Sequence, residues 1–330
     1  MYKLAGSSVH QVRLVQAILS TATVLLVYYL ASLCLRPLST LIATILVATY
    51  PPFIYANGLL LSEVVFTFFF ALAIYMLLLG SLKYHITTLA ASGFFMGLAL
   101  LIRPTPFFLI PVLMCYSCLR LGNNRPLRLK CATLFTASLI LTLAPWWIRN
   151  YYLYGKLVLF STSGTNPLLW GVHPYFIGVS QTFDTIYSQH PTELERYHMW
   201  LHEAKHLAAN YFQNRPVEYL KWLVFGKLSY LWSKPWVEDG SIALYLESIR
   251  KPLHLALVAS GWLGTVLSVF SRAFVINFIA FIPVYYTIFH ICFMGLPRYA
   301  FPVMPFMIIL SVFFIEVTTG ALVNRLRHLR

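Results

Sequence analysis

The stretch TLIATILVATYPPFIYANGLLLSEVVFTFFFALAIYMLLLG, residues 40–80, decides the fold class, because it joins two nearly unbroken apolar runs through a short turn. Each run approaches the roughly 20 apolar residues that cross a bilayer as a helix. Pro51 and Pro52 interrupt the first run, and Glu63 opens the second. An ionised side chain costs about 2.5–3.5 kcal/mol at the centre of a membrane helix, so Glu63 is expected to have a partner or a function.

The whole chain shares this character. Its 330 residues are 59% hydrophobic and only 10% charged, with a mean hydropathy of +0.72. Such a composition excludes an ordinary soluble domain and predicts an all-α polytopic membrane protein whose surroundings are the lipid bilayer. The net charge of +14 comes largely from lysine and arginine in loops beside apolar segments, which orient membrane proteins. We therefore expect no nucleic-acid partner.

Nine apolar stretches predict about nine transmembrane helices, with one long loop between the sixth and the seventh. The stretches are roughly 14–35, 38–56, 59–80, 86–102, 104–119, 129–148, 252–270, 274–294 and 299–319. This divides the chain into an N-terminal bundle of six helices (1–148), a loop region with interfacial helices (149–251) and three C-terminal helices with a basic tail (252–330). The apolar run at 218–232 contains lysines and predicts an interfacial or re-entrant helix, not a span.

Basic residues predict the orientation, because they occupy every second loop. They are Arg36, Lys83, Arg120, Arg125, Arg128, Lys130, Arg272 and, in the tail, Arg325, Arg327 and Arg330. By the positive-inside rule these loops and the C-terminus are cytoplasmic. The long loop, with eight of the ten carboxylates, is then extracytoplasmic, and the N-terminus lies outside.

The same topology gathers the unusual polar residues at the outer ends of their helices. They are Glu63, Arg103, the pair Arg149 and Asn150, and the pair Arg298 and Tyr299. Three guanidiniums at one level predict an anion site, and a lipid phosphate lies at this depth. Two alternatives remain open: the arginines contact lipid headgroups as snorkelling residues, or Glu63 is only a structural partner of Arg103 or Arg149.

Histidines offer weaker candidates for a metal site. His198, His202 and His206 recur every fourth residue, a spacing that can place ligands on one helix face, although an amphipathic loop helix lying on the membrane explains it more simply. His173, between Val172 and Pro174 in the long loop, is a candidate sugar or metal contact. The five cysteines lie in or beside apolar segments and predict neither disulfides nor a redox centre.

Four stretches resemble a known family. YPPFIYANGLLLSEVVFTFF, GLALLIRPTPFFLIPVL, APWWIRNYYLYGKLVLFSTSGTNPLLWG and RYAFPVMPFMIIL are similar, in this order, to signature stretches of membrane-embedded glycosyltransferases that use a polyprenyl-phosphate sugar. These are the protein O-mannosyltransferase and aminoarabinose-transferase type, with the GT-C fold. The resemblance covers about residues 10–320.

The resemblance implies a reaction and roles for residues. An acceptor nucleophile, on a glycan, glycolipid or protein, would attack the anomeric carbon, and polyprenyl phosphate would leave. Arg103, Arg149 or Arg298 would neutralise the phosphate, with Asn150 and Tyr299 as neighbours. Glu63 would hold a divalent metal ion or a sugar hydroxyl, and the loop at 161–174 would cover the acceptor side.

One departure from the family pattern concerns the catalytic acid. The family's acidic base lies in a first outer loop that follows one further helix, whereas no acid precedes Glu63 here. We therefore expect an N-terminally shortened member that is inactive as written. Alternatives are a transporter or flippase of an anionic or lipid-linked substrate and a non-catalytic membrane subunit. The compact loops favour a bacterial inner membrane.

Overall fold

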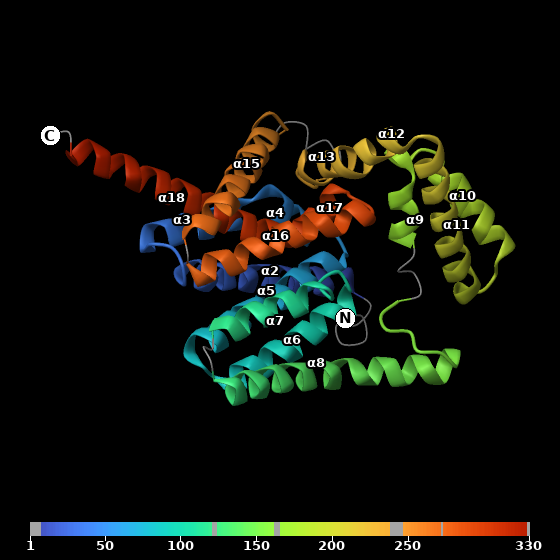
Figure 1. Cartoon of the computed structure of the whole chain (residues 1–330), viewed down its shortest axis with the longest axis horizontal. Helices are drawn as coiled ribbons and strands as arrows, with labels where there is room; N and C mark the ends of the chain where they lie inside the picture. The colour runs from blue at the N-terminus through green and yellow to red at the C-terminus, as the bar shows by residue number, and fades with distance from the viewer. Residues whose placement is uncertain (1–7, 121–123, 162–165, 238–246, 272, 329–330) are drawn as a thin grey trace. The chain divides into compact units, whose positions relative to one another are not determined.

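The computed structural model describes residues 8–120, 124–161, 166–237, 247–271 and 273–328, and within these ranges the side chains of all residues except 247, 248 and 321–328. All regular structure in these ranges is helical (Figure 1). The chain divides into two compact units. Unit 1 comprises residues 1–145, 235–283 and 301–330, and unit 2 comprises residues 146–234 and 284–300. Arg272 and the side chains of the tail arginines lie outside the described residues.

Unit 1 is a bundle of apolar helices. Its elements are α2 (Val9–Ser32), α3 (Pro37–Thr49), α4 (Pro51–Asn57), α5 (Ser62–Lys83), α6 (Ile86–Ile102), α7 (Leu109–Arg120), α15 (Glu247–Ser271), η4 (Phe301–Val303), α18 (Met304–His328) and the first parts of α8 (Arg125–Tyr154) and α16 (Phe274–Cys292). Helix α5 packs against α2 and α6, and α18 packs against α15 and α3 (Figure 1). Leu78 and Phe306 on these helices are fully buried, which places the core of the unit along α5 and α18.

The expected membrane class is confirmed. Six described helices are long and apolar enough to cross a bilayer, and α3 with α4 forms a seventh candidate that is bent by 46°. The bend falls at Pro51 and Pro52, where the missing N–H groups interrupt the helical ladder. The two remaining predicted spans correspond to the shorter apolar helices α6 and α7. The run at 218–232 is not among the candidate spans of the described residues. The protein is an integral, multi-pass, all-helical membrane protein.

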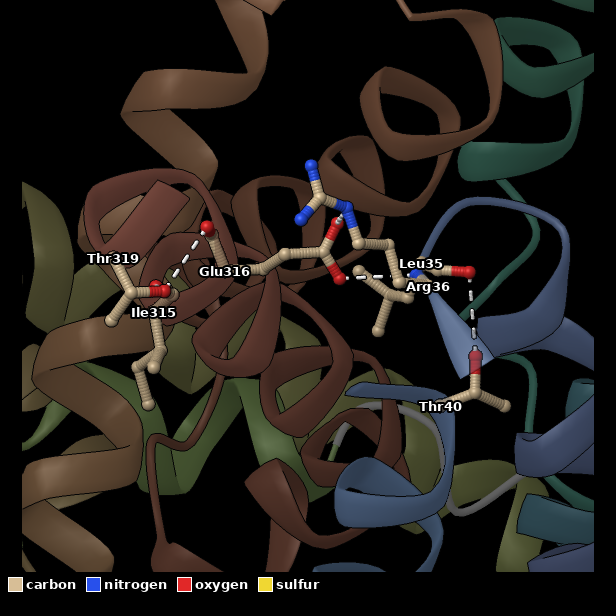
Figure 2. Close-up of polar contacts among 6 residues, drawn as sticks. All are labelled: Leu35, Arg36, Thr40, Ile315, Glu316 and Thr319. Atoms are coloured by element: carbon tan, nitrogen blue, oxygen red, sulfur yellow. Dashed lines mark hydrogen bonds and ion pairs between the residues drawn. The ribbon is translucent and has the colours of Figure 1, made fainter. Parts of the chain in front are cut away.

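Contacts within unit 1 agree with the alternation of the predicted loops. At one end Arg36 Nε lies 3.7 Å from Glu316 Oε1, and the backbone N–H of Arg36 donates to Glu316 Oε2 at 3.0 Å (Figure 2). The Arg120 guanidinium lies over the ring of Phe274 at 5.9 Å. Loops predicted on the same side therefore meet. Which side faces the cytoplasm stays a prediction, as does the division of the chain into three regions.

Helices α15 and α18 approach closely because small residues lie between them. A Cβ atom added to Gly264 would collide with the carbonyl oxygen of Leu310, and one added to Gly261 would come within 2.9 Å of the carbonyl oxygen of Met307. Hydroxyls of Ser260 and Ser311 share a hydrogen bond of 2.6 Å across the same contact. Small residues let membrane helices pack backbone to backbone. The contact is therefore specified by residue size.

Unit 2 has its own core. Its further elements are α9 (Asn166–Val172), η2 (Pro174–Phe176), α10 (Val179–Gln189), α11 (Glu193–Asn214), α12 (Pro216–Lys221), the π-helical turn η3 (Trp222–Gly226), α13 (Lys227–Trp232) and α17 (Pro297–Ala300). Helix α11 packs against α9 and α10 (Figure 1). Trp200, Tyr219 and Trp222 fill the space between these helices. Thr192 begins α11 with a capping box that it shares with Glu195.

Candidate functional site

Glu63 and Arg103 meet at one end of unit 1 because two helices end there. Helix α5 begins at Ser62, so Glu63 lies in its first turn, where the helix dipole favours a negative charge. Helix α6 ends at Ile102, since Pro104 forces Arg103 into an extended conformation. Gln16 from α2 donates to the carbonyl of Leu61 at 2.7 Å and fixes the start of α5. The sequence thus positions both charged groups by local rules.

The two side chains form a short, buried ion pair. Arg103 Nη2 lies 2.6 Å from Glu63 Oε1; the Glu63 side chain is fully buried and the Arg103 side chain is 16% exposed. The same nitrogen lies 3.5 Å from Ser62 Oγ. A small cavity of about 10 Å³ next to Val64 and Thr67 has room for a single water molecule. The carboxylate is therefore enclosed, and the guanidinium is the group that reaches the surface.

Arg149 and Asn150 lie near the C-terminal end of α8 in unit 2. Gly155 follows the last residue of this helix in a left-handed conformation (φ 63°). Residues 158–160 then run back beside the end of α8. Three side chains of α8 then donate to three successive carbonyls: Asn150 to Val158 at 3.2 Å, Trp147 to Leu159 at 2.8 Å and Trp146 to Phe160 at 2.8 Å. Arg149 Nη1 donates to Asn150 Oδ1 at 3.1 Å.

These residues form one wall of a cleft of about 430 Å³, which we call the unit 2 cleft. Helices α10 and α11 supply the opposite wall, with Tyr187, Glu193, Arg196 and Trp200. The Arg149 guanidinium lies over the ring of Trp146 at 5.3 Å, and that of Arg196 lies over Tyr187 at 4.4 Å. The cleft thus combines two cations, one carboxylate and several aromatic rings in a space of ligand size.

Arg298 and Tyr299 lie on the short helix α17, also in unit 2. The Tyr299 ring packs against His290 at 5.2 Å, and its hydroxyl donates to Met294 Sδ at 3.8 Å. Glu63 and Arg103 belong to unit 1, whereas Arg149 and Arg298 belong to unit 2. The predicted level common to the three arginines therefore stays a prediction.

His173 is buried in unit 2, where its Nδ1 donates to the carbonyl of Ile177 at 3.1 Å. Its Nε2 is buried and has no hydrogen-bond partner among the described residues. Burial lowers the pKa of His173, so the neutral ring keeps Nε2 as an acceptor. The described residues contain no group of three His, Cys, Asp or Glu side chains that fits a metal ion. The metal-binding roles expected for Glu63 and His173 stay predictions.

The sequence predicted Arg103 and Arg149 as site residues, but it did not predict the side chains that lie around them. Arg196 and Trp200 lie in a polar amphipathic helix, and nothing in their spacing indicates that they face Arg149. Tyr50 and His254 are a second pair that the sequence did not indicate: the hydroxyl and Nδ1 share a buried hydrogen bond of 2.6 Å. Lys227 was visible as a cation in an apolar run; its Nζ donates to the carbonyl of Ile291 at 2.6 Å.

The N-terminal part of the chain is similar to a known protein family. Residues 1–148 match a family described as dolichyl-phosphate-mannose-protein mannosyltransferase. No curated protein and no solved structure matches the chain. The matched segment contains Glu63 and Arg103 and ends one residue before Arg149. It is less than half of the chain, so the N-terminal bundle is similar to this mannosyltransferase family.

Proposed function

We propose that the protein is a glycosyltransferase that takes a sugar from a polyprenyl-phosphate donor and transfers it to an acceptor on the extracytoplasmic face. One observation carries the proposal: the segment that matches the mannosyltransferase family holds the buried Glu63–Arg103 pair at a helix end. A phosphate group at the membrane surface needs a cation near the end of a helix, and the planar guanidinium of arginine can donate two hydrogen bonds to it. The bacterial inner membrane is the proposed location.

The proposed reaction exchanges one bond at the anomeric carbon. An acceptor oxygen or nitrogen forms a bond to the anomeric carbon while the bond from this carbon to the phosphate oxygen breaks. Polyprenyl phosphate leaves with the electron pair and carries away the proton that the acceptor loses. Arg103 stabilises the charge that develops on the phosphate. Arg149 with Asn150, and Arg298 with Tyr299, are the further donor-phosphate candidates. His173 is a candidate sugar contact.

Glu63 acts as a positioning residue in this proposal. Its carboxylate is enclosed and holds Arg103 Nη2 at 2.6 Å, which fixes the position of the guanidinium. It does not deprotonate the acceptor, because its carboxylate is fully enclosed behind Arg103 and out of the acceptor's reach. The acceptor, a glycan, glycolipid or protein, follows from the family resemblance alone.

Transfer of labelled sugar in native membranes tests the proposal. The gene is deleted in its own host, and membranes receive polyprenyl-phosphate donors that carry radiolabelled mannose, glucose or aminoarabinose. We expect transfer from one donor to be lost on deletion and restored by the wild-type gene. Unchanged transfer without the gene would contradict the proposal. Movement of the intact donor across the membrane, without transfer, would favour a flippase instead.

A further inference from the structure

The unit 2 cleft is built for a ligand with both a flat apolar face and a negative charge. Its aromatic members are Trp146, Tyr154, Phe160, Tyr187 and Trp200, and its polar members are Arg149, Asn150, Ser161, Glu193 and Arg196. Its volume of about 430 Å³ falls in the range of pockets for small molecules. All these residues belong to one compact unit.

Both guanidiniums are held in place before any ligand arrives. Arg196 stacks on Tyr187, and its Nη1 donates to the carbonyls of His190 at 3.1 Å and Pro191 at 3.0 Å. Arg149 stacks on Trp146 and donates to Asn150. Within the described part of the chain neither arginine has a carboxylate oxygen within the 4.0 Å of an ion pair. Two braced cations that carry no ion pair form a preorganised anion site.

Trp200 supplies an independent indication of a ligand. The residue is 8% exposed and lines the cleft. Its indole Nε1 is buried and has no hydrogen-bond partner among the described residues. A buried donor without a partner costs about 1–3 kcal/mol, and tryptophan N–H groups normally find one. A small shift of the indole toward the cleft would let an oxygen atom of a bound ligand accept from this N–H group.

Sugars have the chemistry that these groups match. The C–H face of a pyranose packs on aromatic rings, and its hydroxyls accept from indole or guanidinium N–H groups and donate to carboxylates such as Glu193. Two arginines against one carboxylate leave an excess positive charge. We infer that the unit 2 cleft binds a saccharide that carries an acidic group, either a phosphate or a carboxylate.

This inference deepens the proposed function and rests on it for the source of the ligand. The acidic saccharide is either the sugar phosphate of the donor or an acidic acceptor glycan. Binding can be measured without any transfer. Its failure is therefore distinguishable from failure of the proposed function, which is read from transfer in membranes.

Titration calorimetry on the full chain in lipid nanodiscs tests the inference. The probes are mannose 1-phosphate for the donor and a glucuronic-acid disaccharide for the acceptor, with methyl mannoside as the neutral control. We expect saturable binding of at least one acidic probe, at least tenfold tighter than the neutral one and weaker in high salt. Preference for either acidic probe identifies the source. Absence of binding by both would overturn the inference.

Two matched pairs of variants locate the site. Arg196→Gln should weaken binding about 10- to 100-fold, as expected for the loss of a charged hydrogen bond, whereas Arg215→Gln should not change it. Arg215 is an exposed arginine of unit 2 in an ion pair with Glu218 and does not line the cleft. Equal effects of the two arginine variants would overturn the inference.

The tryptophan pair separates binding from folding. Trp200→Phe removes the buried N–H while keeping an aromatic ring, so it should weaken binding about fivefold or more, with a loss of melting temperature no larger than that of the control variant. Trp222→Phe removes another buried indole N–H that lacks a partner among the described residues, in the core of the same unit and away from the cleft. It should leave binding unchanged. A Trp200→Phe variant with wild-type affinity would overturn the assignment of this residue.

Discussion

Arg103 lies between Glu63 and the surface of unit 1: its Nη2 is 2.6 Å from the Glu63 carboxylate, which is fully buried, while its own side chain is 16% exposed. The pair therefore presents a cation at its end of the bundle and keeps the acid behind it. This geometry agrees with a role for Glu63 as the residue that orients Arg103. It also explains why an acid is tolerated in an apolar helix, since its charge is balanced at hydrogen-bond distance.

The two members of this pair should depend on each other. Arg103→Gln leaves a buried carboxylate without its cation and should destabilise unit 1 by about 3–5 kcal/mol. The double variant Glu63→Gln/Arg103→Gln removes both charges and should recover most of that loss. Thermal unfolding in detergent measures both. A double variant as unstable as the sum of the single variants would show that the residues do not act as a pair.

Close packing of α15 and α18 should be sensitive to one added methyl group. Gly264→Ala should destabilise the bundle by about 1–3 kcal/mol, because its Cβ would meet the Leu310 carbonyl. Gly320→Ala on α18 is the control, since a Cβ there meets no atom within 4 Å. The control should be neutral or slightly stabilising by helix propensity. Equal melting temperatures for the two variants would argue against this contact.

Lys227 should make stability depend on pH. Burial lowers the pKa of Lys227 from 10.5 to about 8. The unfolded chain then binds more protons than the folded chain between pH 8 and 10.5, so the free energy of unfolding should rise with pH across this window. Lys227→Met should remove the rise, whereas Lys221→Met, at an exposed position, should preserve it. The lowered pKa of Lys227 would be contradicted if the free energy of unfolding of the wild-type chain fell over this window and that of Lys227→Met followed the same course.

Same-end contacts predict a pattern of chemical labelling. In a cysteine-free background, Gly58→Cys and Lys83→Cys introduce thiols at exposed positions at the two ends of unit 1. A membrane-impermeant thiol reagent applied to intact cells should label residue 58 and not residue 83. Both should react after the membrane is opened. Labelling of residue 83 alone in intact cells would show that the orientation is the reverse of the predicted one. Labelling of both residues would contradict the prediction that successive loops lie on opposite sides of the membrane.

The sequence allowed the class of fold to be predicted, because apolar runs of membrane length have few alternative structures. Glu63 and Arg103 could be placed at neighbouring helix ends from the sequence, because basic residues occupy every second loop and because Pro104 ends the helix before Arg103. The predicted stretch 86–102 has the bounds of α6, and Pro51 and Pro52 marked the break between α3 and α4, because proline interrupts a helix. The start of α7 at Leu109, five residues after the predicted start, could not be read from hydropathy, since hydropathy records apolar character and not where a helix begins. Arg196, Trp200 and Tyr187 could not be assigned to Arg149, because this pairing depends on how α10 and α11 pack. The charge of Lys227 was visible, whereas its partner, the carbonyl of Ile291, leaves no trace in residue type.

Equilibrium binding of polyprenyl phosphate to the purified chain in nanodiscs tests the central claim most directly, since every proposed role of the arginines requires it. We expect saturable binding that competes with a polyprenyl-phosphate sugar. The Glu63→Gln/Arg103→Gln variant should bind about 10- to 100-fold more weakly, as expected for loss of a charged hydrogen bond, and Arg215→Gln should bind normally. Absence of saturable binding by the wild-type chain, or equal affinity in the double variant, would contradict the account.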